Sequence, residues 1–363
     1  MLQIITIIIN KDNEPGNQSF IFVIQGNQEL TPDLFAETEI LEFLEFQDFS
    51  QPLVIGTLPD SIREIDMSMA DFNHPLEPGI LPRFLEKLTV RAFNQLLIPG
   101  AFPETLQYLE IIHFNQKIQA NVFPDSLLVL KMMSFDQSLG PGSLPQNLEE
   151  LEINNLIDPL IPGIFPESLL RLEMISFDQP ISLGLLPQNL EVLDINNFNQ
   201  PLTPGVFPES LVMLVMNRFN QPLEPGVLPQ NLDTLIAHGF MHLLEPGVLH
   251  GSIKDLDLVD HRHSPRDMDG VYDHCFKQGV LPDDLESGNL GILDPLTILP
   301  PNMKKLIIID SPILIVPGRL PDTITDLTFG VFNQVIEPLS LPRSLQSLRF
   351  GRLFNQMVYC PVD

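Results

Sequence analysis

The segment Phe198-Asn-Gln-Pro-Leu-Thr-Pro-Gly-Val-Phe-Pro-Glu-Ser-Leu211-Val-Met-Leu214-Val-Met216-Asn-Arg is one unit of a 21-residue repeat, and Phe219 begins the next unit. A proline preceded by Leu or Phe marks the same place in most units. These prolines are Pro82, Pro103, Pro124, Pro145, Pro166, Pro187, Pro208 and Pro229, and the register returns at Pro300, Pro321 and Pro342. A fixed period of this length is typical of a solenoid, in which each coil buries its apolar face against its neighbours.

The end of each unit predicts a short β-strand. Leu214 and Met216 alternate with the variable positions 213 and 215, as expected for a strand with one buried face. Stacked coils would align such strands into a long parallel sheet, at about 4.8 Å per coil. On the opposite side, the Leu-Pro or Phe-Pro step disfavours helix and fixes an extended backbone. We expect that side to be polyproline-like or to contain a single 3-10 turn.

Three other recurring positions predict a turn, a core and a bend. Pro-Gly pairs such as Pro204-Gly205 supply the fixed φ and the positive φ of a type II turn at one corner of the coil. The Phe of Phe-Asn-Gln falls where an inward residue is due, which predicts a continuous aromatic stack. Its members are Phe72, Phe93, Phe114, Phe135, Phe177, Phe198 and Phe219. The Gln two places later, as at Gln200, is expected to hydrogen-bond backbone groups at the bend.

The composition narrows the class of partner. The 363 residues contain 47 acidic and 19 basic side chains, for a net charge of −28. This charge repels phosphate backbones and anionic lipids, so we expect neither nucleic acid nor membrane as a partner. A basic protein partner is compatible with it, as is a simple role in solubility. Only Cys275 and Cys360 are cysteines, and residues 1–10 are apolar without a basic leader, which together favour a cytoplasmic location.

The period divides the chain into a cap and a solenoid. Residues 1–40 are predicted to form an amino-terminal β-hairpin cap with strands at 2–9 and 19–24, joined through residues 15–16. Residues 41–363 are predicted to form the solenoid. The period fails in an irregular insertion at about 259–298, because 50 residues separate His250, in the proline slot, from Pro300.

The predicted insertion contains residue types that bind zinc, namely His261, His263, His274 and Cys275. Their spacing matches no tight metal motif, and a surface loop is the alternative interpretation. The chain has no phosphate-binding glycine loop, nucleophile elbow or metalloprotease motif. We therefore expect no enzymatic activity and no cofactor.

The pattern Phe-Asn-Gln-Pro-Leu-x-Pro-Gly-x-Leu-Pro-x-x-Leu-x-x-Leu resembles the FNIP repeat of amoebae and of the giant viruses that infect them, over roughly residues 41–363. Its second half is also similar to the short bacterial type of leucine-rich repeat. The resemblance implies a right-handed, β-rich, leucine-rich-repeat-like solenoid with a parallel concave sheet. It also implies a protein-interaction scaffold, in the host cytoplasm if the protein is viral. Some family members carry an amino-terminal F-box, whereas residues 1–30 here predict strands.

The leading hypothesis is a non-enzymatic scaffold that binds a protein partner on its concave sheet. The outward strand positions turn apolar at Val212, Met213, Val215 and Ile236, which makes these residues the candidate contact patch. A loop or flanking side chains covering that patch is the competing interpretation. Three other functions stay open: a ubiquitin-ligase substrate receptor without a recognisable F-box, a metal-dependent enzyme using the His-rich insertion, and a virion structural component.

The last coil is predicted to lack a cap. We expect the coil that includes Leu345, Leu348 and Phe350 to be either frayed or buried against a second copy, which would give a homodimer through the C-terminal coil.

Overall fold

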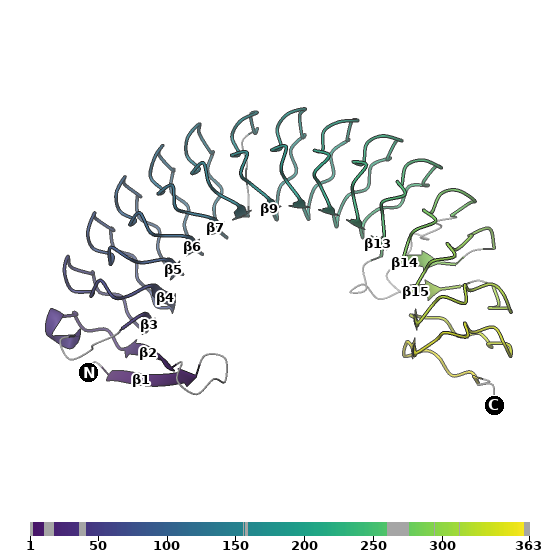
Figure 1. The fold of residues 1–363 in the computed structure, drawn as a ribbon, viewed down its shortest axis with the longest axis horizontal. Helices are drawn as coiled ribbons and strands as arrows, with labels where there is room; N and C mark the ends of the chain where they lie inside the picture. The colour runs from purple at the N-terminus through teal and green to yellow at the C-terminus, as the bar shows by residue number, and fades with distance from the viewer. Residues whose placement is uncertain are drawn as a thin grey trace. The chain divides into compact units, whose positions relative to one another are not determined.

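The computed structural model describes residues 3–10, 18–35, 41–154, 156, 159–259, 276–293, 295–311 and 313–358. The chain divides into two compact units, Met1–Phe177 and Asp178–Asp363. In each unit the chain coils repeatedly, and the strands lie along the inner side of the stacked coils (Figure 1).

The sheet of the first unit begins with an antiparallel pair and continues with parallel strands. Its strands are β1 (Gln3–Asn10), β2 (Gln18–Gln25), β3 (Phe43–Gln47), β4 (Glu64–Met69), β5 (Lys87–Val90), β6 (Tyr108–Ile111), β7 (Val129–Met132), β8 (Glu150–Ile153) and β9 (Arg171–Met174). A 3-10 helix, η2 (Pro32–Phe35), lies between β2 and β3. Strand β2 pairs in parallel with β3, so the β1–β2 hairpin extends the sheet of the coils. Whether residues 1–40 act as a cap stays a prediction.

The sheet of the second unit is parallel. Its strands are β10 (Val192–Asp194), β11 (Met213–Val215), β12 (Thr234–Ile236), β13 (Asp255–Asp257), β14 (Ser287–Ile292), β15 (Lys305–Asp310), β16 (Asp326–Phe329) and β17 (Ser347–Phe350). Residues 21 apart face each other in neighbouring strands, as Leu214 faces Leu235. The strands alternate between buried and partly exposed positions, as the Leu-x-Ile pattern requires. The predicted β-rich solenoid of leucine-rich-repeat type is therefore confirmed.

The predicted aromatic stack forms the centre of the coils. All seven predicted phenylalanines are at most 1% exposed. Ring centroids of Phe72 and Phe93 lie 6.5 Å apart, and those of Phe198 and Phe219 lie 6.1 Å apart, with nearly parallel planes. Phe240 continues the stack at 6.3 Å from Phe219. Leu156 occupies the same slot in the coil that lacks a phenylalanine, and it is 3% exposed.

Two hydrogen-bonded turns shape every regular coil. At the Pro-Gly corner Gly205 has a φ of 84°, and the N–H of Val206 donates to the carbonyl of Thr203 at 3.3 Å, as in a type II turn. Glycine is favoured there because an L side chain rarely adopts this φ, although Asn121 and Leu339 hold the same position in other coils with φ of 60° and 66°. After the recurring proline, the N–H of Leu211 donates to the carbonyl of Pro208 at 3.1 Å. The convex side is thus extended, with one i to i+3 turn per coil.

A ladder of asparagines joins successive coils, and the sequence reasoning missed it. The side-chain oxygen of Asn73 accepts hydrogen bonds from the backbone N–H of Asn94 and from the amide of Gln95, at 2.9 and 3.1 Å. Asn94 accepts from the next coil in the same way, at 2.9 and 3.2 Å. The glutamines were expected to bond backbone groups. Gln95 and Gln116 bond the asparagine side chain instead, and Gln221 bonds both the side-chain oxygen and the backbone carbonyl of Asn199, each at 3.2 Å.

A second ladder runs along the convex side. The hydroxyl of Ser210 donates to the carbonyl of Leu190 in the preceding coil at 2.7 Å. Ser126 and Thr323 occupy the same repeat position, and they donate to Leu106 at 2.7 Å and to Met303 at 2.8 Å. In the coils that contain these residues, side-chain hydrogen bonds join neighbouring coils both at the Phe-Asn-Gln bend and on the convex side.

The stretch at about 259–298, predicted to be an irregular insertion, contains strand β14. Residues 260–275 lie outside the described residues, but β14 pairs in parallel with both β13 and β15, and its pairing with β15 shifts register after Asn289. Asp255 faces Ser287 and Ser287 faces Lys305, so a coil of 32 residues is followed by one of 18. The second coil escaped the pattern because Gly288 occupies the slot of a core leucine. A β-carbon at Gly288 would lie 3.1 Å from Met303 and 3.3 Å from Leu290, whose side chains occupy that space.

Candidate protein-interaction surface

The outward side chains of β10 to β13 form two rows, which we call the β10–β13 face. One row is Asp194, Val215, Ile236 and Asp257, and the neighbouring row is Val192, Met213, Thr234 and Asp255. Each residue faces the next one in register, so consecutive side chains of a row are about 4.8 Å apart. The inward alternates, such as Leu214 and Leu235, belong to the core.

Three of the four predicted contact residues lie at the surface. Val212, which immediately precedes β11, is 43% exposed, and Met213 and Ile236 are half-buried. Val215 was expected to be exposed and is only 7% exposed. Its short side chain is flanked in register by Asp194 and Ile236, which shield it. The surface that a partner can contact is therefore formed by Val212, Met213 and Ile236, and Val215 lies buried beneath it.

A polar cluster borders this face at β13. The Nε2 atom of His238 lies 3.3 Å from a carboxylate oxygen of Asp257, and the Asn289 amide donates to the other oxygen at 2.7 Å. Burial alone would raise the pKa of Asp257. The hydrogen bond and charge of His238 lower it, as do hydrogen bonds from the N–H of Val259 and the Asn289 amide. Together they outweigh burial and hold the pKa of Asp257 below its usual value. Asp257 therefore keeps its negative charge beside Ile236.

The sequence reasoning did not assign Asp257 and His238 to this surface. The repeat itself contained the signal, because Asp257 is 21 residues after Ile236 and His238 is 21 residues after Asn217. Asn217 in turn donates its amide to Asn196 one coil earlier. Because the 21-residue period breaks at residue 259, the sequence pattern did not show that Asp257 and His238 continue these rows.

The corresponding rows of the first unit are mostly polar, with Val129 of β7 as an apolar member. Lys131 lies 2.9 Å from Glu152, and Lys87 lies 2.6 Å from Glu64. The hydroxyl of Tyr108 donates to Glu110 at 2.7 Å. Burial raises the pKa of Tyr108, as do the hydrogen bond to Glu110 and the nearby carboxylates. The hydrogen bond to Glu152 raises the pKa of Lys131, so this ion pair persists at neutral pH. The apolar side chains on the β10–β13 face thus differ from the charged rows of the first unit.

The zinc hypothesis receives no support from the part of the chain that the structure describes. His261, His263, His274 and Cys275 lie outside the described residues. Elsewhere His242 and His250 contact backbone carbonyls, of Asn220 at 3.1 Å and of Leu228 at 2.9 Å. Within the described ranges, no group of three or more His, Cys, Asp or Glu side chains could hold a metal ion.

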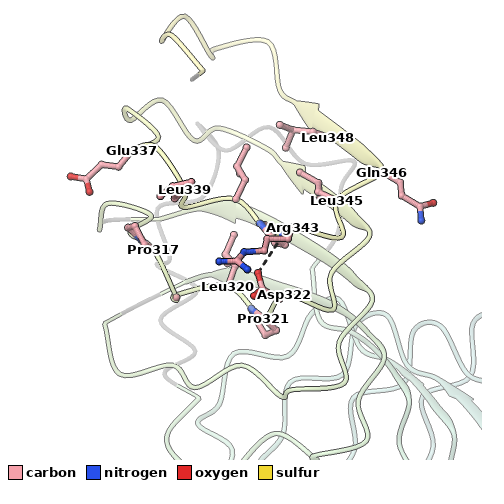
Figure 2. A pocket seen from close by; sticks show the side chains of 13 residues that line it. Pro317, Leu320, Pro321, Asp322, Glu337, Leu339, Arg343, Leu345, Gln346 and Leu348 are labelled. Carbon is pink, nitrogen blue, oxygen red and sulfur yellow. Dashed lines mark hydrogen bonds between the residues drawn. The ribbon is translucent and has the colours of Figure 1, made fainter. Parts of the chain in front are cut away.

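A second surface feature is a cavity of about 810 Å³ at the coil of β17. Figure 2 shows Leu320, Leu339, Leu345 and Leu348 around it, and the backbone N–H of Arg343 donating to Asp322 at 3.3 Å. Leu345, Leu348 and Phe350 are half-buried, and their equivalents one coil earlier, Ile324, Leu327 and Phe329, are at most 1% exposed. The coil is formed, because β17 pairs with β16 along its length. The ring of Phe354 stacks on that of Phe350, with the centroids 3.8 Å apart, whereas Leu345 and Leu348 stay partly exposed beside the cavity.

Comparisons with known proteins agree with this fold. CroV588, a giant-virus protein whose structure is described as a novel circular LRR protein, is 28% identical over 88% of this chain, with a TM-score of 0.74. This chain spans about half of that structure, since the match covers 51% of it. YopM from Yersinia enterocolitica is 18% identical over 88% of this chain and 81% of its own, with a TM-score of 0.44. No curated protein matches the chain. Among the described residues, no helix has the length and apolar character needed to span a membrane.

The FNIP Repeat family model matches residues 72–113, 114–156, 158–197, 198–239 and 332–358, which together exceed half of the chain. The matched segments contain the phenylalanine stack, the asparagine ladder and the Pro-Gly turns of both units. On this evidence the chain belongs to the FNIP repeat family, and its fold is a leucine-rich-repeat-like solenoid, a scaffold typical of protein–protein interaction.

Proposed function

We propose that the protein is a non-enzymatic scaffold that binds a protein partner on the β10–β13 face. The observation that carries this proposal is the exposure of Val212, Met213 and Ile236 at and beside outward strand positions that are mostly polar in the other coils. The invariant positions of the repeat hold the coils together, whereas these outward positions make no contribution to the core. They can therefore contact a partner without loss of stability.

Affinity purification from native or infected cells tests the proposal. The full chain is compared with the double variant Val212→Asp/Ile236→Asp and with the control Leu183→Asp, which changes an exposed leucine (72%) away from the strands. We expect one or more proteins to be retained by the wild type and the control but lost from the double variant. Identical sets of retained proteins from all three would contradict the proposal. A ubiquitin-ligase adaptor among the retained proteins would favour the substrate-receptor alternative.

A second proposal concerns the coil of β17, which we propose packs against a second copy of the chain. The half-buried Leu345, Leu348 and Phe350 and the cavity beside them provide apolar surface for such a contact. The local charge permits it, because residues 299–358 contain six basic and four acidic side chains in a strongly acidic protein.

Sedimentation velocity distinguishes the dimer from a monomer. Leu339 lines the cavity and is 73% exposed, so Leu339→Glu should weaken a dimer without unfolding the coil. Leu183→Glu is the matched control, because Leu183 is 72% exposed in another coil. We expect only Leu339→Glu to shift the protein toward monomer. A wild type that is monomeric at all accessible concentrations would refute the dimer.

A further inference from the structure

The row Asp194, Val215, Ile236, Asp257 has a carboxylate at each end and two apolar side chains between them. Three steps between neighbouring strands separate the two carboxylates, which corresponds to about 14 Å. Both aspartates are half-buried at the surface of the sheet. A ligand that crosses the strands would meet negative charge, apolar surface and negative charge in that order.

Acidic side chains outnumber basic ones around the row, and His238 lies 3.3 Å from the carboxylate of Asp257 at one end. Residues 190–259 contain eight acidic and two basic side chains. One of the two basic residues, Lys254, is already paired with Asp233 at 3.3 Å. Near one end the amide of Asn196 donates to Asp194 at 2.6 Å, and near the other the N–H of Val259 donates to Asp257 at 3.2 Å. At Asp257 these contacts outweigh burial and hold the pKa of the carboxyl below its usual value.

We propose that this row binds an extended segment of a protein partner with Lys or Arg at positions i and i+4 and an apolar residue at i+2. The spacing matches, because an extended chain rises about 3.3 Å per residue and places residues i and i+4 about 13 Å apart on one side. The two basic side chains pair with Asp194 and Asp257, and the apolar side chain contacts Ile236 and the edge of Val215. This inference rests on the proposed function of the β10–β13 face and specifies its partner by charge.

Both contributions are needed for specificity. Partly exposed ion pairs contribute modestly and are screened by salt, so the carboxylates mainly select and orient the segment. The apolar contact gains from removal of Ile236 and its neighbours from water. A segment with only basic residues would lack the apolar contact, and a segment with only apolar residues would lack the ion pairs. Either segment would therefore bind more weakly.

Selection of random 12-residue peptides displayed on phage, against the full chain, tests the inference. We expect the selected peptides to be enriched in the basic-x-apolar-x-basic pattern. A synthetic peptide with this pattern should bind about two- to fivefold more weakly to Asp194→Asn, and its affinity should fall as salt rises. Asp326→Asn changes an exposed aspartate of β16 and should leave binding unchanged. Melting temperatures of the variants separate a binding effect from unfolding.

The outcomes distinguish this inference from the proposed function. Selected peptides that lack basic residues but lose binding to Ile236→Asp would overturn the inference and leave the interaction face in place. Basic peptides that bind Asp194→Asn and Asp326→Asn equally well would show attraction to the overall charge only, and would also overturn it. Failure to select any peptide would count against the inference, whereas the affinity purification would still test the proposed function independently.

Discussion

Substitution of one stacked phenylalanine tests the packing of the coils most directly. Phe219 is fully buried, and its ring lies 6.1 Å from Phe198 and 6.3 Å from Phe240. Burying a side chain of this size contributes about 1.5–3 kcal/mol. Its neighbours are held by their own coils and cannot close the gap, so a cavity penalty adds to this loss. Phe219→Ala should therefore lower the free energy of unfolding by about 3–5 kcal/mol.

The chain provides a matched control for this substitution. Leu156 occupies the same slot in another coil and is 3% exposed, so a leucine can fill the space between neighbouring coils. Phe219→Leu should therefore cost no more than about 1.5 kcal/mol. The difference between the alanine and leucine variants isolates the cavity from the loss of the aromatic ring.

Urea denaturation measures the change, and hydrogen exchange locates it. Stacked coils need not unfold in a two-state manner, because each coil contacts only its neighbours. Exchange should therefore accelerate most in the coils around residues 198–240 of the alanine variant. A loss below about 1 kcal/mol, or equal losses for alanine and leucine, would refute the assignment of this ring as the main contact between coils.

Three further predictions concern other contacts of the second unit. Gly205→Val should lower the melting temperature more than Ser210→Ala does. Valine is strained at a φ of 84°, whereas Ser210→Ala removes one hydrogen bond that contributes about 1 kcal/mol. Equal shifts in melting temperature would exclude the proposed turn. Asn199→Ala should cost about 1–3 kcal/mol in urea denaturation, because it leaves the N–H of Asn220 without its acceptor and leaves the amide of Gln221 only the backbone carbonyl of residue 199. An unchanged midpoint would contradict the ladder. Because the pKa of Asp257 is lowered from 3.8, its stabilising contribution is present above about pH 4 and is lost as pH falls through the lower folded value. The melting temperatures of wild type and Asp257→Asn should therefore differ at pH 6 and converge only as pH falls below the lowered pKa of Asp257 in the folded protein, and a constant difference would refute the ionised pair.

The sequence predicted the features that recur in every coil. Phe198 and Gly205 repeat at fixed offsets, and each has one physical role, so their period identified the stack and the turn. The asparagine ladder was missed because the pattern of residue types does not say which polar group bonds which. Asn94 bonds across coils, and that choice depends on the curvature of the chain at the bend.

The candidate site was only partly predictable. Val212 and Ile236 were found because apolar residues at outward positions are unusual in this chain. The burial of Val215 depends on its neighbours in the adjacent strands, which the local sequence does not describe. The coil of β14 was missed for the opposite reason, since Gly288 carries no side chain that would mark a core position.

The asparagine ladder also bears on how such a chain can change in length. Each asparagine accepts from the following coil, and its own backbone N–H donates to the preceding one, so every regular unit presents the same two connections. If a block of 21 residues were duplicated or deleted, the asparagine at each junction would therefore still find a hydrogen-bond partner in the neighbouring coil. Recombination between copies of the repeat could lengthen or shorten the protein in whole units, with each product already able to fold.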